Sequence, residues 1–234
     1  MTVRILFRVL ALAYLALLLL FPVSMVFARA FSKGLGAVWQ AITEPAALHA
    51  LWMTLLIASI AVAANTVFGI ICATVLVRHN FRGKSLLNAI LDLPLAVSPV
   101  VIGLALLIIY GRTSPIGAWL AEMGIRILFS TPGMILATIF VSLPFVVREV
   151  VPVMREIGTE QEQAASTLGA SAFQTFRMVT LPAIRSGVAY GIVLTMARAI
   201  GEFGAVSIVS GKISGITETM TIYVASSFQR FDLV

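Results

Sequence analysis

Long apolar runs dominate the sequence, and polar or charged residues gather in the shorter segments between them. Five of these runs approach or exceed the about 20 apolar residues that an α-helix needs to cross the hydrocarbon core of a bilayer. The pattern therefore predicts an all-α, polytopic membrane helix bundle. Its predicted spans are residues 5–29, 50–77, 86–110, 130–153 and 183–210.

Two parts of the chain depart from this simple pattern. Pro94 and Pro99 lie inside the run 86–110, and a proline removes an intrahelical hydrogen bond, so a kink or a broken start is expected there. Asp92 adds a charge to the same run. Residues 212–234 contain no run long enough to cross, which predicts an interfacial or re-entrant helix.

Composition supports a membrane protein and excludes several other classes. With 60% hydrophobic and 11% charged residues and a mean hydropathy of +1.04, the chain carries too little charge to cover a water-facing surface. Cys72 is the only cysteine, so no internal disulfide is expected. Two histidines beside one thiol argue against a histidine or cysteine metal site.

The formal net charge of +6 comes from basic residues at the ends of the predicted spans, which indicates charge-directed topology rather than binding to nucleic acid. A cytoplasmic N-terminus places more Lys and Arg inside than outside, and five crossings then leave the C-terminus outside. The loop after the second span is densely basic. It predicts an anchor to anionic lipid at the inner face, formed by Arg78, Arg82 and Lys84.

The segment 155–181 breaks the apolar pattern and carries two helix-start signals. Thr159 and Glu162 have the spacing of a capping box, in which the Thr side chain accepts from a backbone N–H and the Glu side chain reaches back to the cap. Ser171 and Gln174 have the same spacing. They predict the start of a second helix that runs to about residue 180.

A glycine corner is predicted between these two helices. The first helix occupies about residues 160–168, and Gly169 can take the left-handed conformation that ends a helix without a Cβ penalty. Leu181 and Pro182 close the second helix, because proline is favoured in the first turn of the helix that follows. The predicted order is helix, glycine corner, helix and fifth span.

The first short helix presents a small apolar face made of Ala164, Ala165 and Leu168, while Glu160 and Glu162 suit the positive end of its dipole. These residues alone leave two interpretations open: the face docks a soluble partner below the membrane, or it packs on its own bundle. A DNA-binding helix-turn-helix fits poorly, because predicted spans lie immediately on both sides.

The residues of this segment resemble the EAA loop of ABC-importer permeases. The family pattern is Glu-Ala-Ala, three residues, Gly, nine residues, Ile, one residue and Leu-Pro. Here Gln163-Ala164-Ala165, Gly169 and Val179-Thr180-Leu181-Pro182 keep that spacing, with Gln163 in place of the usual Glu and Val179 in place of the usual Ile. The resemblance implies a coupling helix seated in a groove of a cytoplasmic ATPase subunit.

The acidic residue of the EAA pattern is the main departure. Glu162, next to Gln163, either takes over the acidic role or only caps the helix. The coupling residues that the resemblance implies are Thr159, Glu160, Glu162, Gln163, Ala164, Ala165, Leu168, Gly169, Leu181 and Pro182.

A second resemblance covers nearly the whole chain from the second span onward. The segments 93–101 (LPLAVSPVV) and 197–211 (ARAIGEFGAVSIVSG) look like the sulfate and thiosulfate permease subunits of ABC importers. Molybdate and tungstate permeases share much of this similarity and remain the alternative. The resemblance implies one transmembrane permease domain over residues 1–234 with a type I ABC-importer fold. Such permeases usually have six spans, so a chain cut before its last helix, or a departure from the family, is expected.

The resemblance also implies partners and a location. Two related, non-identical permease subunits would enclose the path in the inner (plasma) membrane of a prokaryotic cell. A pair of ATPase subunits would use ATP and Mg and dock on residues 159–170. A periplasmic anion-binding protein would deliver the anion near Lys33, Arg112 or residues 212–234. This chain itself is then not an enzyme and binds no cofactor.

Other chemistry finds little support in the sequence. Gly83-Lys84-Ser85 matches the end of a phosphate-binding loop, but the upstream glycine that the loop requires is replaced by Arg78. Both histidines lie at span ends, so an intramembrane protease would lack its base. Nothing indicates the inverted halves of a stand-alone secondary transporter.

Arg198 and Glu202 are ionisable residues inside the fifth predicted span, where such groups tend to be paired or functional. They are four residues apart and project from one helix face, with Arg198 roughly 24 Å from Pro182 and beyond the midplane. Three roles stay open: a structural pair, a gate element, or direct contact with the anion. Hydroxyls along a path would come from Ser98, Ser142, Ser207 and Ser210, although serines in spans more often bond their own backbone.

Overall fold

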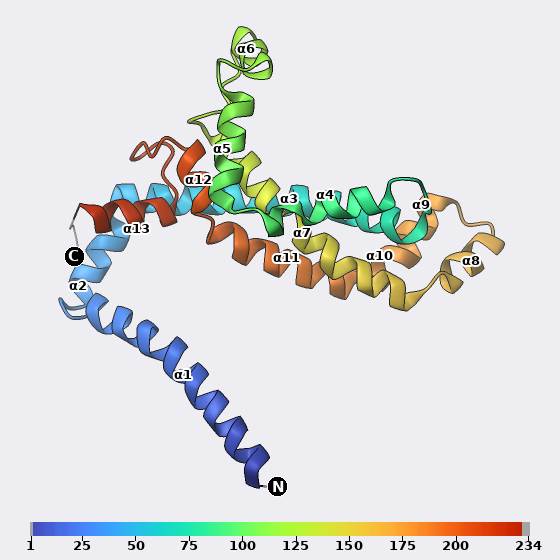
Figure 1. The fold of residues 1–234 in the computed structure, drawn as a ribbon, viewed down its shortest axis with the longest axis horizontal. Helices are drawn as coiled ribbons and strands as arrows, with labels where there is room; N and C mark the ends of the chain where they lie inside the picture. Colours follow the sequence, from blue (N-terminus) through green and yellow to red (C-terminus); the bar gives the residue numbers. More distant parts are fainter. Residues whose placement is uncertain (1, 231–234) are drawn as a thin grey trace. The chain divides into compact units, whose positions relative to one another are not determined.

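The computed structural model describes residues 2–230, with side chains from residue 5 onward, and within this range every regular element is a helix (Figure 1). The all-α prediction is therefore confirmed. The chain divides into two compact units, residues 1–48 with 226–234 and residues 49–225. Within the described residues, three helices are long and apolar enough to cross a membrane alone, and the number of spans rises to five if each of two bent helix pairs is counted as one span.

The smaller unit begins with α1 (Thr2–Ala30), which includes all residues of the predicted span 5–29. Its residues Ile5–Ala30 have a hydropathy of 2.5 and meet the length and composition of a span. A turn then leads into α2 (Leu35–Thr43), and Gly34 precedes this helix with a φ of 89°, a conformation that suits glycine.

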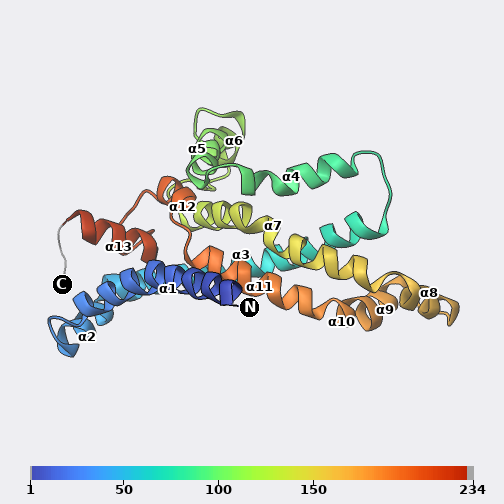
Figure 2. The same cartoon turned by 60° about the horizontal axis from the view of Figure 1, so that its bottom comes forward.

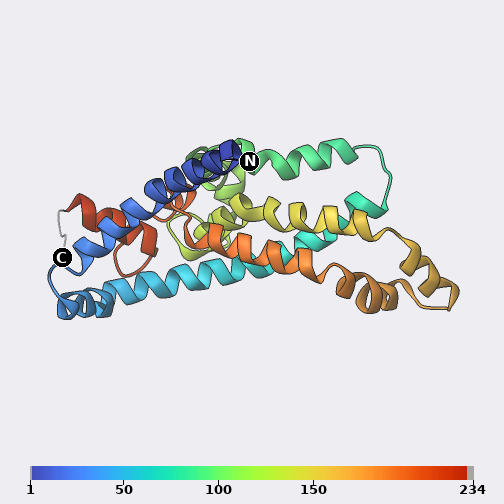
Figure 3. The same ribbon diagram turned by 90° about the horizontal axis from the view of Figure 1, so that it is seen from below.

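Three long helices form the centre of the larger unit. α3 (Pro45–Arg78), α7 (Thr131–Ile157) and α11 (Arg185–Ile200) run alongside one another (Figure 3). Two apolar clusters lie between them and their neighbours. One includes Met53, Ile102, Met134 and Val206, and the other includes Leu76, Leu91, Val150 and Met154. Both α3 and α7 contribute to the two clusters, and α7 also packs against α11 and against the helices α4 (Lys84–Ala96), α5 (Pro99–Tyr110) and α12 (Gly204–Val209).

Glycines allow α11 to approach α7 closely. A Cβ atom added at Gly191 would lie 2.8 Å from the Cα of Val146, and one added at Gly187 would lie 2.8 Å from the carbonyl oxygen of Glu149. Small residues at such contacts let two helix backbones pack together in a membrane. The sequence places both glycines where the facing backbone leaves no room for a side chain.

Replacing Gly191 with alanine is expected to destabilise the protein by about 1–3 kcal/mol, because the added Cβ forces the two backbones apart. Gly201→Ala is the matched control. Its Cβ would meet no atom closer than 3.5 Å, so we expect a change within about 0.5 kcal/mol. Thermal unfolding in detergent measures both. Equal unfolding temperatures for the two variants would contradict the close packing.

The structure divides the predicted range 86–110 into two helices. α4 (Lys84–Ala96) lies beside α7 (Figure 2). α5 (Pro99–Tyr110) follows α4 after a bend of 111° between these two helices. The break falls at Val97 and Ser98, which are extended with ψ of 137° and 135°. A residue before proline is pushed out of the helical region, so Pro99 sets the position of the break. Pro94, in contrast, lies inside α4.

The predicted range 183–210 is also divided. α11 ends at Ile200, and three residues separate it from α12 (Gly204–Val209). α12 packs against α5, where a Cβ added at Gly204 would lie 2.9 Å from the Cβ of Pro99. The short helix α6 (Pro115–Glu122) follows α5. Residues 183–210 therefore do not form one continuous helix. The C-cap residue of α11 is Gly201, and Glu202 is buried in the break before α12.

The residues after α12 form turns and then a short helix, α13 (Met220–Gln229). The backbone N–H of Met220 donates to Thr54 Oγ1 at 2.8 Å, and His49 Nε2 lies 3.4 Å from the carbonyl oxygen of Ile216. These contacts fasten the segment to α3. At ten residues, α13 is shorter than a span, as the sequence predicts.

Candidate functional site

The segment between α7 and α11 folds as two short helical pieces joined at Gly169. α8 (Glu160–Thr167) precedes the corner. After it, α9 (Ala172–Thr175) continues as the π-helix η1 (Phe176–Thr180) and then as α10 (Leu181–Ala183). The helical direction changes by 69° before α11 begins. The predicted order of helix, glycine corner and helix is confirmed, with a π-helical section that the sequence did not indicate.

Gly169 makes the corner by adopting a φ of 86°. Its N–H donates to the carbonyl oxygen of Ser166 at 3.0 Å, and the N–H of Ala170 donates to that of Ala165 at 3.1 Å. This pair of bonds is the Schellman arrangement, which satisfies the last carbonyl groups of a helix. The prediction of a left-handed glycine at this position is confirmed.

One of the two predicted capping boxes forms. The N–H of Ser171 donates to Gln174 Oε1 at 2.8 Å, and the N–H of Gln174 donates to Ser171 Oγ at 3.3 Å, so the second box is confirmed. The first box is wrong. Thr159 makes no side-chain cap and instead accepts a bond from Gln163 Nε2 at 3.1 Å, which leaves Glu162 to other partners.

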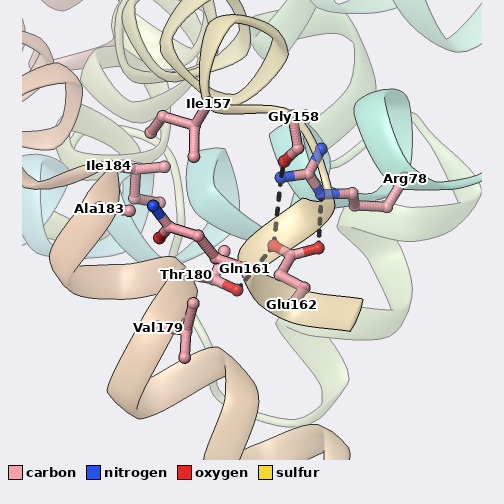
Figure 4. A pocket seen from close by; sticks show the side chains of 9 residues that line it. All are labelled: Arg78, Ile157, Gly158, Gln161, Glu162, Val179, Thr180, Ala183 and Ile184. Atoms are coloured by element: carbon pink, nitrogen blue, oxygen red, sulfur yellow. Dashed lines mark hydrogen bonds and ion pairs between the residues drawn. The ribbon is translucent and has the colours of Figure 1, made fainter. Parts of the chain in front are cut away.

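Glu162 turns toward the long helices and binds Arg78 (Figure 4). Arg78 Nη2 donates to Glu162 Oε1 at 3.1 Å, and Arg78 Nε lies 2.9 Å from Oε2, so the guanidinium grips both carboxylate oxygens. Thr180 Oγ1 also donates to Oε1 at 2.8 Å. The interpretation of Glu162 as a helix cap is therefore wrong, because its carboxylate is engaged by α3 and η1.

Arg78 is itself held by the end of α7. Its Nη1 donates to the carbonyl oxygen of Met154 at 3.3 Å and its Nη2 to that of Gly158 at 2.7 Å. The Arg78 side chain is 13% exposed, so its prediction as a lipid anchor is wrong: the guanidinium points into the protein. No local spacing links Arg78 with Glu162, which explains why sequence reasoning missed the pair.

The other face of this segment is open. Leu168 is 88% exposed, and Phe173 and Met178 are similarly exposed on α9 and η1. Ala164 is exposed and Ala165 is half-buried. Several large apolar side chains therefore face outward around the Gly169 corner. A cavity of about 10 Å³, lined by Arg78, Glu162 and Thr180 among others, is at the limit for a single water molecule.

Arg198 and Glu202 form an ion pair with an Nη1–Oε2 distance of 2.6 Å. Arg198 lies in the last turn of α11, whereas Glu202 lies in the break beyond it, so the two do not share one helix as predicted. Glu202 Oε1 accepts from the N–H of Ala205 at 2.8 Å, and Thr221 Oγ1 donates to the Glu202 carbonyl oxygen at 2.8 Å. The pair thus joins α11, α12 and α13.

The four candidate path serines differ in their exposure and in their hydrogen-bond partners. Ser142 is buried on α7, where it accepts from Asn65 Nδ2 at 2.9 Å and donates to the carbonyl oxygen of Thr138. Ser207 donates to the carbonyl oxygen of Gly204, and Ser210 is buried and accepts from a backbone N–H. Ser98 is exposed at the start of α5. Their place along a path stays a prediction.

A second polar contact that sequence reasoning missed joins α4 to α7. Both carboxylate oxygens of Asp92 accept from the Arg148 guanidinium, with a distance of 2.7 Å for Nε–Oδ1, and Arg148 Nη2 also donates to Asn88 Oδ1 at 3.3 Å. The signal was present, since Asp92 is the one acidic residue in its apolar run and a charge there needs a partner.

Among the described residues, no group of three or more His, Cys, Asp or Glu side chains is placed to hold a metal ion.

Comparison with known proteins places this geometry in context. The family model described as binding-protein-dependent transport system inner membrane component matches residues 65–230. Sulfate transport system permease protein CysW of Escherichia coli (strain K12) is 53% identical over 219 residues, which cover 94% of this chain and 75% of that protein. CysW of Synechocystis sp. is 51% identical over 98% of this chain and 83% of its own length. Sulfate transport system permease protein CysT of Escherichia coli (strain K12) is 38% identical over 95% and 80%.

Proposed function

This chain belongs to the family of binding-protein-dependent transport system inner membrane components, and from this premise we propose that it is the permease subunit of an ATP-driven importer of sulfate or thiosulfate. The observation that carries the substrate is the 53% identity to CysW over 94% of the chain. Relatives named for the same substrate at 51% and 38% identity support it. Transport would follow alternating access between two global states.

The coupling segment supports docking of a separate ATPase. Ala164 on α8 and Leu168 directly after it are exposed, and no residue of this helix is buried, so its face is free to enter a groove. ATP and Mg would be bound by that ATPase, because the segment near Gly83-Lys84-Ser85 lacks the glycine of a phosphate-binding loop. The permease itself carries out no chemical reaction in this proposal.

Membrane orientation follows from the same segment. If an ATPase docks on residues 159–170, that segment lies in the cytoplasm, and counting crossings backward places the N-terminus there too. The basic residues of the sequence agree with this orientation. We place the protein in the inner (plasma) membrane of a prokaryotic cell, beside a second, related permease subunit.

The outer face would receive the anion from a periplasmic binding protein. Arg112 and Arg126 line a cavity of about 740 Å³ between the end of α5, α6 and the loop before α7. Among the described residues that line it, none is acidic. A dianion approaching this cavity would meet positive charge, which raises its local concentration.

Uptake of radiolabelled sulfate tests the proposal. A bacterial strain without its own sulfate permeases is supplied with this protein, its second permease subunit, the ATPase and the binding protein. We expect sulfate uptake that thiosulfate competes for and that stops when the ATPase is omitted. Uptake of molybdate in place of sulfate would identify the alternative anion, and uptake without the ATPase would identify a secondary transporter.

A further inference from the structure

The helix α8 packs against α9 and η1, and one of its side chains supplies its side-chain hydrogen bonds to distant elements. None of its residues is buried. Its other side-chain hydrogen bonds stay local: Gln163 bonds Thr159, and Ser166 and Thr167 bond carbonyl oxygens of their own helix. Within the described chain, Glu162 is the α8 side chain that bonds to distant elements, through Arg78 and Thr180.

The contact is built to hold α8 in a fixed orientation. The Arg78 guanidinium binds both oxygens of the Glu162 carboxylate, and a two-point contact of this kind fixes direction as well as distance. The same guanidinium donates to Met154 and Gly158 at the end of α7. With side chains 13% and 22% exposed, Arg78 and Glu162 are shielded from competing water.

We propose that Arg78 and Glu162 are coupling residues that transmit the movement of α8 to α3 and α7. When the ATPase displaces α8, the ion pair carries the ends of these two helices with it, and Thr180 carries η1. Arg78 is the better residue for this task than lysine would be, because its five N–H donors can bind both carboxylate oxygens and two carbonyl groups at once, whereas lysine has three. The inference rests on the proposed function, since it requires an ATPase on α8.

The test compares two acidic residues in the complete importer, one in the ion pair and one outside the coupling segment. The permease pair, the ATPase and the binding protein are reconstituted in liposomes, and ATP hydrolysis and sulfate uptake are measured in the same vesicles. Glu162→Gln is expected to leave assembly and ATP hydrolysis intact while uptake per ATP falls about tenfold, the effect of losing a charge-assisted contact. Glu122→Gln, at an exposed residue of α6 outside the coupling segment, is the control and should keep the wild-type ratio.

A second variant separates coupling from folding. Arg78→Gln combined with Glu162→Gln removes both charges of the ion pair, so neither is left without its partner. The double variant is therefore expected to assemble with the ATPase even if Glu162→Gln alone assembles poorly. It should be as uncoupled as the single variant. A wild-type ratio of uptake to ATP hydrolysis in the double variant would overturn the inference. Failure of the unaltered chain to bind any ATPase would instead overturn the proposed function.

Discussion

Replacing Arg198 with glutamine is expected to reduce stability and uptake more than replacing Arg198 and Glu202 together. The Glu202 side chain is 1% exposed, and without Arg198 its charge has no cation beside it. Leaving a buried charge uncompensated typically costs about 3–5 kcal/mol. When both residues become glutamine, no charge remains, and the new side chain at position 202 can still accept from the N–H of Ala205.

The complete cycle of variants measures this coupling. Glu202→Gln alone should cost less than Arg198→Gln, because Arg198 is 30% exposed and reaches other polar groups more easily. Thermal unfolding in detergent gives the stability of each variant, and uptake in vesicles gives its function. Strictly additive losses would show that the two residues act separately. An Arg198→Gln variant that is stable but fails to transport would favour a gate over a structural lock.

Replacing Gly169 with valine is expected to lower sulfate uptake about tenfold. Valine in the left-handed conformation costs roughly 1–3 kcal/mol, so the corner no longer holds α8 and α9 in position. The φ of 86° at this residue is a strained conformation for a β-branched side chain. An added Cβ would meet no atom within 4 Å, so crowding does not contribute. The loss is a backbone effect confined to the coupling segment, and co-purification with the ATPase should weaken in parallel.

Two controls separate this effect from general damage. Gly169→Asn should retain most of the uptake, because asparagine tolerates the left-handed conformation better than other residues. Gly34→Val introduces a similar strain at a φ of 89° with open space around it, in the smaller unit before α2. Its uptake should stay close to that of the unaltered protein. Normal uptake and ATPase binding by Gly169→Val would contradict the importance of the corner.

Local signals in the sequence predicted local geometry well. The left-handed turn at Gly169, the capping box of Ser171 with Gln174 and the break near Pro99 each depend on residues within a few positions of one another. Their physical causes act over the same short range: an absent Cβ, a short polar side chain, and the steric clash of a proline ring with the residue before it. Such features need no knowledge of the tertiary fold.

Contacts between distant residues were beyond the reach of the same reasoning. Glu162 could satisfy a local capping box, yet Arg78 offers a stronger, charged partner from another helix. Glu202 follows Arg198 at helical spacing, yet its carboxylate binds the N–H of Ala205 and the helix ends before it. The partner of Glu162 comes from a distant helix, whereas the partner of Glu202 lies three residues further along the chain, beyond a helix end that the spacing did not predict.

The sharp bend between α4 and α5, at Val97 and Ser98, has a mechanical consequence. With a 111° bend, α5 does not prolong the axis of α4, so sliding α4 along its own length would swing α5 mostly sideways. At about 1.5 Å per residue, the twelve residues of α5 form a lever about 18 Å long. At Gly103 of α5 and Gly204 of α12 the two helices approach too closely for a Cβ atom, so this contact would be the point about which α5 turns.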